Sequence, residues 1–227
     1  LLSILILSSC AELQSVVDNL PNQTGIDNST IASGLRQALD FGIDKQVTKL
    51  TQKDGFYGNS LVKILRPEEL QKVDQTLRNV GLGSLADEGL KVLNRAAEDA
   101  VSEATPIFVD AVKGITFTDA RNILLGADNS ATTYLENKTS AQLYDKFNPV
   151  IKSSFSKVGA DQIWSNLITK YNALPLTNNV NPDLTDYVTK EALKGVYTMI
   201  AVEEKEIRTD FSARTTTLLK KVFALQD

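Results

Sequence analysis

Residues 86–104 read ADEGLKVLNRAAEDAVSEA, and the spacing of apolar residues in this stretch decides the fold class. Apolar side chains recur every three or four positions, which is the period of an α-helix with one buried face. The apolar stripe consists of Ala86, Leu90, Leu93, Ala97, Val101 and Ala104, and the opposite face carries Glu88, Lys91, Arg95 and Asp99. The alanines predict close approach of a neighbouring helix. We expect Arg95 and Asp99, four positions apart, to form an ion pair.

The chain on both sides of this stretch follows the same period. Pro106 is expected to end or kink the helix, and Thr105 to cap a continuation through Val112. Further helices are predicted at residues 29–50, 67–81 (closed by Gly81), 118–125, 130–138, 139–158 (with Pro149 inside), 161–174, 185–208 and 215–224. Because no segment shows the alternation typical of strands, the sequence predicts an all-α protein with a single domain of about eight to ten helices over residues 29–227.

The N-terminal residues predict export and a lipid anchor. Residues 1–10 read LLSILILSSC, an apolar run too short to span a bilayer, which needs about 20 helical residues. Residues 1–9 are therefore interpreted as a signal-peptide remnant. The ending Leu-Ser-Ser-Cys resembles the bacterial lipobox, which predicts lipidation of Cys10, followed by a tether over residues 10–28. The alternatives are an ordinary secretory signal with a chance cysteine, or a buried N-terminal strand.

The expected location is the bacterial cell envelope, with the protein lipid-anchored in a membrane through Cys10. Ala11 follows the cysteine, and the absence of aspartate there predicts the periplasmic face of the outer membrane.

Composition excludes several chemistries. The chain has no histidine and one cysteine, so a His-based triad, a His metal ligand, an intrachain disulfide and a thiolate zinc cluster cannot form. With 24 Lys and Arg against 28 Asp and Glu, the net charge is −4, and the longest basic run is Lys220-Lys221. Nucleic acid is therefore not an expected partner. No metal, no cofactor and no catalytic residue is predicted.

Three carboxylate or hydroxyl groupings are weaker candidates for a site. Glu203 and Glu204 flank an apolar stripe and could serve as a general base or metal ligands, but we favour rim residues, with Glu204 pairing to Arg208. A second grouping could hold Ca²⁺, although it lacks the glycine and closing glutamate of known calcium loops; it consists of Asn178, Asn179, Asn181, Asp183 and Asp186. Ser153 and Lys157 lie four apart without a context for nucleophilic catalysis.

The connection at residues 54–59, DGFYGN, is the candidate binding loop, with Asp54, Phe56, Tyr57 and Asn59 as its site residues. Aromatic side chains supply large contact areas, and loops on a rigid scaffold often carry binding residues. The alternative is that Phe56 plugs the core and Tyr57 covers the next helix. The binding hypothesis requires at least one exposed ring.

Several segments together resemble an uncharacterised bacterial lipoprotein family, domain of unknown function 4197. They are DGFYGN (54–59), RPEELQKV (66–73), LNRAAEDAV (93–101), PIFVDAVKGITFTDARNILLG (106–126), YNALP (171–175), DLTDYVTKEALKGVY (183–197) and ARTTTLLKKVF (213–223). The resemblance spans the body of the chain in order. It implies a helical envelope protein with a lipobox and without an assigned activity.

The function expected from the sequence is that of a non-enzymatic binding or scaffold module of the cell envelope, with an envelope protein or an apolar ligand as partner. The alternatives are a lipid-binding lipoprotein and a carboxylate-based or metal-assisted envelope enzyme. A polar cavity lined by several acids would favour an enzyme, and an apolar cavity would favour lipid binding.

Overall fold

The computed structural model describes residues 26–79, 83–159 and 183–226, together with positions 162, 165, 168, 169 and 172. All regular elements in these residues are helices, which confirms the predicted all-α fold. The signal remnant, Cys10, the tether before residue 26, the Gly81 cap and most of the helix predicted at 161–174 lie outside the described residues.

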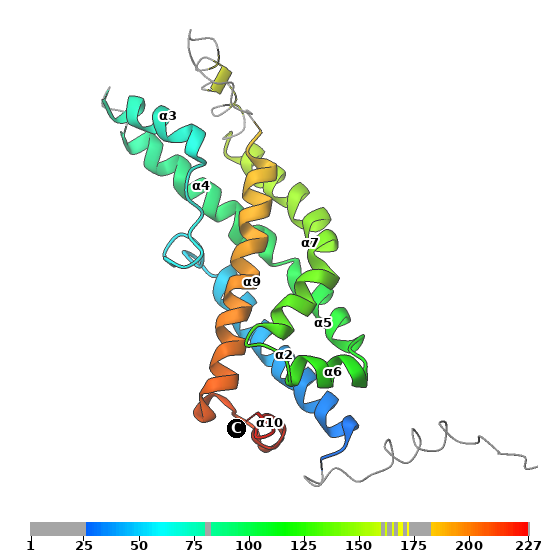
Figure 1. The fold of residues 1–227 in the computed structure, drawn as a ribbon. Coiled ribbons are helices and arrows are strands. Elements are labelled where there is room, and N and C mark those ends of the chain that lie inside the picture. The colour runs from blue at the N-terminus through cyan, green and yellow to red at the C-terminus, as the bar shows by residue number, and fades with distance from the viewer. Residues whose placement is uncertain are drawn as a thin grey trace, which may run out of the picture.

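The described helices follow one another along a single domain (Figure 1). They are α2 (Asn28–Thr51), α3 (Glu68–Asn79), α4 (Gly83–Val101), α5 (Ala104–Lys113), α6 (Phe117–Leu124), α7 (Ser130–Lys157), α9 (Thr185–Thr209), the short 3₁₀ helix η1 (Phe211–Ala213) and α10 (Thr217–Phe223). In the described residues, none of these helices is long and apolar enough to cross a membrane.

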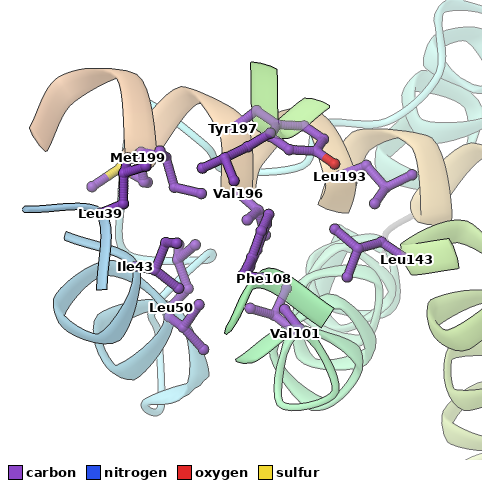
Figure 2. Packing of buried hydrophobic residues seen from close by; sticks show 14 of the residues in the cluster. Leu39, Ile43, Leu50, Val101, Phe108, Leu143, Leu193, Val196, Tyr197 and Met199 are labelled. Carbon is purple, nitrogen blue, oxygen red and sulfur yellow. The ribbon is translucent and has the colours of Figure 1, made fainter. Parts of the chain in front are cut away.

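Helix α9 organises the core, because it packs against α2, α4 and α7. In Figure 2, Leu39 of α2 lies beside Met199 of α9, and the ring of Phe108 of α5 lies below Val196 of α9. The ring of Phe108 meets the ring of Tyr197 edge-on, with 6.0 Å between the centroids. Each such fully buried side chain stabilises the fold by about 1.5–3 kcal/mol. The core is therefore continuous from α2 through α9 to α7.

The break between α4 and α5 differs from the prediction. Helix α4 ends at Val101, and α5 begins at Ala104 with Glu103 as its N-cap, so Thr105 is not the cap. Pro106 lies in the first turn of α5, where a missing backbone N–H removes no helical hydrogen bond. The proline thus follows the break by several residues.

Helix α7 is one element, although two helices were predicted at 130–138 and 139–158. Thr139, at the predicted junction, is buried and donates its hydroxyl to the carbonyl of Leu135 within the helix. Pro149 also lies inside α7, at a cost of about 3 kcal/mol for a proline in a helix interior. Phe147 and Ile151 on either side of it are fully buried, and their packing offsets that cost.

Candidate functional site

The loop after α2 folds tightly back on the helix that it leaves. Asp54 has a φ of 68°, in the left-handed region that costs a non-glycine residue about 1 kcal/mol or more. Gly55 follows, and a Cβ atom there would lie 2.4 Å from the carbonyl oxygen of Leu50. Only glycine fits at this position. The backbone turn at residues 54–55 therefore fixes where the rest of the DGFYGN loop lies.

Helix α4 holds this loop through Glu98, whose side chain is buried. One carboxylate oxygen of Glu98 accepts the backbone N–H groups of Phe56 and Tyr57 at 3.1 and 3.3 Å. The other oxygen pairs with Arg95, and Arg95 also pairs with Asp54 at 2.7 Å. The predicted ion pair between Arg95 and Asp99 is therefore wrong, because Arg95 reaches across to the loop instead.

Asp99 has a different partner. It accepts a hydrogen bond from the hydroxyl of Ser154 on α7 at 2.9 Å. The polar face of α4 thus contacts two neighbours, the loop and α7, which helical spacing within α4 alone could not indicate.

The two aromatic residues of the loop have different surroundings. Phe56 is fully buried, and its ring lies against Gly195 of α9, where an added Cβ would come within 2.6 Å of the ring. Tyr57 is half-buried, with the ammonium group of Lys63 4.0 Å from its ring centroid. Phe56 is thus a core plug, and Tyr57 is the ring of the loop that solvent reaches.

Asn59 closes the candidate loop. Its side-chain oxygen accepts the backbone N–H of Leu61 at 3.2 Å, and its amide nitrogen lies 3.6 Å from the sulfur of Met199. Asn59 therefore shapes the turn that leads into the next segment and also contacts α9.

Residues 63–66 follow the turn of the loop as an extended run, which α4 and α9 hold by hydrogen bonds. The side-chain amide of Asn94 accepts the N–H of Ile64 at 2.8 Å and donates to the carbonyl of Ile64 at 2.9 Å. The hydroxyl of Tyr187 donates to the carbonyl of Leu65 at 2.9 Å. Ile64 within the run is buried, whereas Leu65 after it and Leu61 in the preceding turn are both more than 60% exposed. Asn94 thus occupies the place of a neighbouring strand.

A groove of about 640 Å³ lies between this extended run and α9. We call it the α9 groove; one wall is formed by residues 60–63, 65–68 and 71, and the other by Tyr187, Glu191, Lys194, Gly195 and Thr198. The volume falls within the range of about 300–1,000 Å³ found for ligand sites. A smaller hollow of about 410 Å³ lies on the other side of the loop, lined by residues 49, 52–55 and 58–60. The loop therefore separates two surface depressions.

The charges in the α9 groove nearly balance. Lys63 and Lys194 contribute positive charge, and Glu68 and Glu191 contribute negative charge. Arg66 also lines the groove, but it is engaged by Asp74 outside it at 3.2 Å. The groove consequently has no strong preference for a polyanion or a polycation.

Glu203 and Glu204 are buried, so their interpretation as rim residues is wrong. The predicted pairing of Glu204 with Arg208 is confirmed, at 2.8 Å. Glu203 pairs with Lys45 and accepts from Gln46, and its hydrogen bond raises the pKa of Lys45. Both carboxylates are therefore occupied by partners on their own and neighbouring helices.

Both acids border a small cavity of about 20 Å³ between α2 and α9, which is otherwise lined mainly by apolar side chains. That volume has room for roughly one water molecule. A lipid chain does not fit this cavity.

The remaining candidates do not come together as a site. Asp183 caps the start of α9 by accepting from Thr185 N–H, and Asp186 is held by Lys190 and Tyr144. The other members of the calcium grouping, Asn178, Asn179 and Asn181, lie outside the described residues. Among the described residues there is no group of three potential His, Cys, Asp or Glu metal ligands. Cys10 also lies outside them.

The sequence interpretation missed the α9 groove and the residues that build it. Asn94 was visible as a polar residue on the apolar stripe, four positions after Leu90 and three before Ala97. Residues 61–66 read LVKILR and do not alternate between apolar and polar residues, so nothing in the sequence indicated an extended run there. Tyr187 and Lys194 had no local signal, because their role depends on a segment more than a hundred residues away.

Comparison with known proteins agrees with the resemblance seen in the sequence. A family model described as a protein of unknown function (DUF4197) matches residues 25–224. No curated protein and no solved structure matches the chain.

Proposed function

Because the chain belongs to the family of proteins of unknown function DUF4197, whose model covers nearly the whole helical body, we propose its role from its own geometry. The proposal is a non-enzymatic binding module of the bacterial envelope, anchored through a lipid on Cys10, which holds a partner protein in the α9 groove.

The single observation that carries this proposal is the position of the α9 groove. The described chain enters at Ile26, directly before α2, and the loop beside the groove follows the other end of α2. Since a helix rises 1.5 Å per residue, the 24 residues of α2 separate these two points by roughly 36 Å. With an anchor at Cys10, the groove would lie roughly 36 Å from the point where the tether joins the domain, so a partner could reach it beside the membrane.

The rigidity of the groove walls supports a binding role. One wall is the buried helix α9, and the other is held by Asn94 and Tyr187 through three hydrogen bonds of 2.8–2.9 Å. A preformed site loses little conformational entropy when a partner binds.

The test is site-specific photocrosslinking in the native envelope. Lys194 in the groove and Lys205 near the other end of α9 are both exposed lysines on the same helix, so they form a matched pair. With a photoreactive residue at each position in turn, Lys194 should yield a discrete crosslinked product and Lys205 should not. Equal products from both positions, or none from Lys194, would contradict the proposal.

A further inference from the structure

The extended run on the groove wall has an inner backbone edge that is bonded to Asn94 and an edge on the α9 side that is only partly occupied. The N–H and C=O of Ile64 are both bonded to Asn94 on the inner side. In an extended chain the backbone groups of the two neighbouring residues point the opposite way. The carbonyl of Leu65 confirms this direction, because it meets the hydroxyl of Tyr187 on the α9 side.

Of the four backbone groups of Lys63 and Leu65, the N–H of Lys63 donates to the carbonyl of Asn59 at 2.8 Å, and the carbonyl of Leu65 accepts from Tyr187. The N–H of Leu65 and the carbonyl of Lys63 have no partner among the described residues. They are separated by one residue, which is the spacing with which one strand donates to and accepts from an antiparallel neighbour. The edge therefore presents one donor and one acceptor in the register that another extended chain requires.

The side chains beside this edge also suit a polypeptide. Leu61 and Leu65 are 63% and 62% exposed, among the most exposed large apolar residues described. The balanced charges of Lys63, Lys194, Glu68 and Glu191 match a segment with little net charge. Polyanions such as nucleic acid or anionic lipid headgroups would gain little electrostatic binding energy in this groove.

We propose that an extended segment of a partner protein enters the α9 groove and pairs with the backbone of Lys63 and Leu65 as an added strand, with apolar side chains against Leu61 and Leu65. Strand addition of this kind takes its affinity from main-chain hydrogen bonds and its selectivity from alternate side chains. The inference rests on the proposed binding function and assigns the partner's conformation.

The test uses a defined probe without net side-chain charge, a short synthetic peptide of alternating Val and Thr with a Lys at one end and a Glu at the other. Binding to the ¹⁵N-labelled chain is followed by nuclear magnetic resonance. The amide signal of Leu65 should shift on titration, and its hydrogen exchange should slow by at least about tenfold, since a free N–H becomes hydrogen-bonded.

Two substitutions at one position separate the backbone from the side chain. Leu65→Pro removes the N–H and suits the extended conformation of Ile64 before it, whereas Leu65→Ala removes only the exposed side chain. We expect Leu65→Pro to weaken peptide binding at least about tenfold, and Leu65→Ala to weaken it by less than about threefold. Equal binding by the wild type and Leu65→Pro would overturn the proposal.

A second measurement does not depend on whether the proline variant folds. The same peptide with all backbone amides N-methylated is titrated into the unchanged protein, where it should not shift Leu65. If the methylated peptide binds as well as the parent, strand addition is wrong. Crosslinking from Lys194 does not depend on this pairing. If the crosslink forms but the peptide test fails, the proposed binding function is still supported and only the added-strand proposal is wrong.

Discussion

At the scale of single residues, the buried pair of Glu204 and Arg208 joins three helices. Glu204 accepts the N–H groups of Ala131 and Thr132 at the start of α7, at 2.9 and 2.8 Å. Arg208 donates to the carbonyls of Ile123 and Leu124 at the end of α6. Negative charge at a helix start and positive charge at a helix end are both stabilising positions. The pair therefore closes two helix ends that α9 brings together.

Replacing Glu204 by Gln should destabilise the protein strongly. The change leaves the Arg208 guanidinium buried without its counter-charge, and breaking such a buried pair costs about 3–5 kcal/mol. Urea unfolding followed by circular dichroism measures the loss. Lys190→Gln, which breaks an exposed pair with Asp186, is the matched control and should cost less than about 1 kcal/mol. Similar losses in the two variants would show that Glu204 carries no special structural role.

The same residues show what the sequence could and could not predict. The spacing of four positions predicted the pairing of Glu204 with Arg208 correctly. Their burial was missed because the groups that compensate it come from Ala131 and Thr132, more than 70 residues away. For Arg95 the same spacing rule failed. An ion pair with the exposed Asp99 would stabilise the fold only slightly, whereas the pair with the buried Glu98 is less screened by water.

At the scale of elements, helical period placed most helices within a few residues of their observed ends. The period located α2 at 29–50 against Asn28–Thr51, and α9 at 185–208 against Thr185–Thr209. It failed at α7, where burial of the side chains around Thr139 and Pro149 overrides local preference. The extended run at 63–66 was missed for a related reason, because the group that bonds to its inner edge is the Asn94 side chain, 30 residues further along the chain, and not a strand.

The contact between the DGFYGN loop and α9 gives a prediction at this scale. Gly195→Ala places a methyl group 2.6 Å from the Phe56 ring, and overpacking of this kind costs about 1–3 kcal/mol. The gain in helix propensity, about 1 kcal/mol, offsets only part of it. Thermal unfolding should show the net loss of stability.

A double-mutant cycle identifies the cause. In a Phe56→Leu background the smaller side chain leaves room for the methyl group, so Gly195→Ala should be neutral or stabilising there. An equal cost in both backgrounds would mean that the alanine clashes with something other than Phe56.

At the scale of the whole molecule, the family, the helical fold and the single domain could be predicted from the sequence, because each depends on patterns repeated along the chain. The α9 groove could not, because its two walls come from segments that only the tertiary fold brings together. The lipid anchor and the envelope location remain predictions from LSSC at residues 7–10.

The anchor is tested by Cys10→Ser. A thioether cannot form on serine, so incorporation of labelled palmitate should be lost and the protein should no longer fractionate with membranes after a high-salt wash. Ser15→Thr, in the predicted tether, leaves the Leu-Ser-Ser-Cys motif unchanged and serves as the control, which should remain labelled. Membrane association of the Cys10→Ser protein after the wash would exclude the lipid as the anchor.

The length of α2 has a consequence for how such a groove would find its partner. Fifteen residues lie between Cys10 and Ile26, and at about 3.5 Å each their greatest possible length is roughly 50 Å. The length of α2 adds roughly 36 Å to this limit. The tether would confine the groove to a half-sphere whose radius is the sum of these two lengths. One partner molecule held in the same half-sphere has an effective concentration of about 1 mM. Weak, rapidly reversible strand pairing would then be enough for substantial occupancy. Confinement at the membrane would thus raise the fraction of grooves occupied, which proteins free in solution achieve by a higher intrinsic affinity.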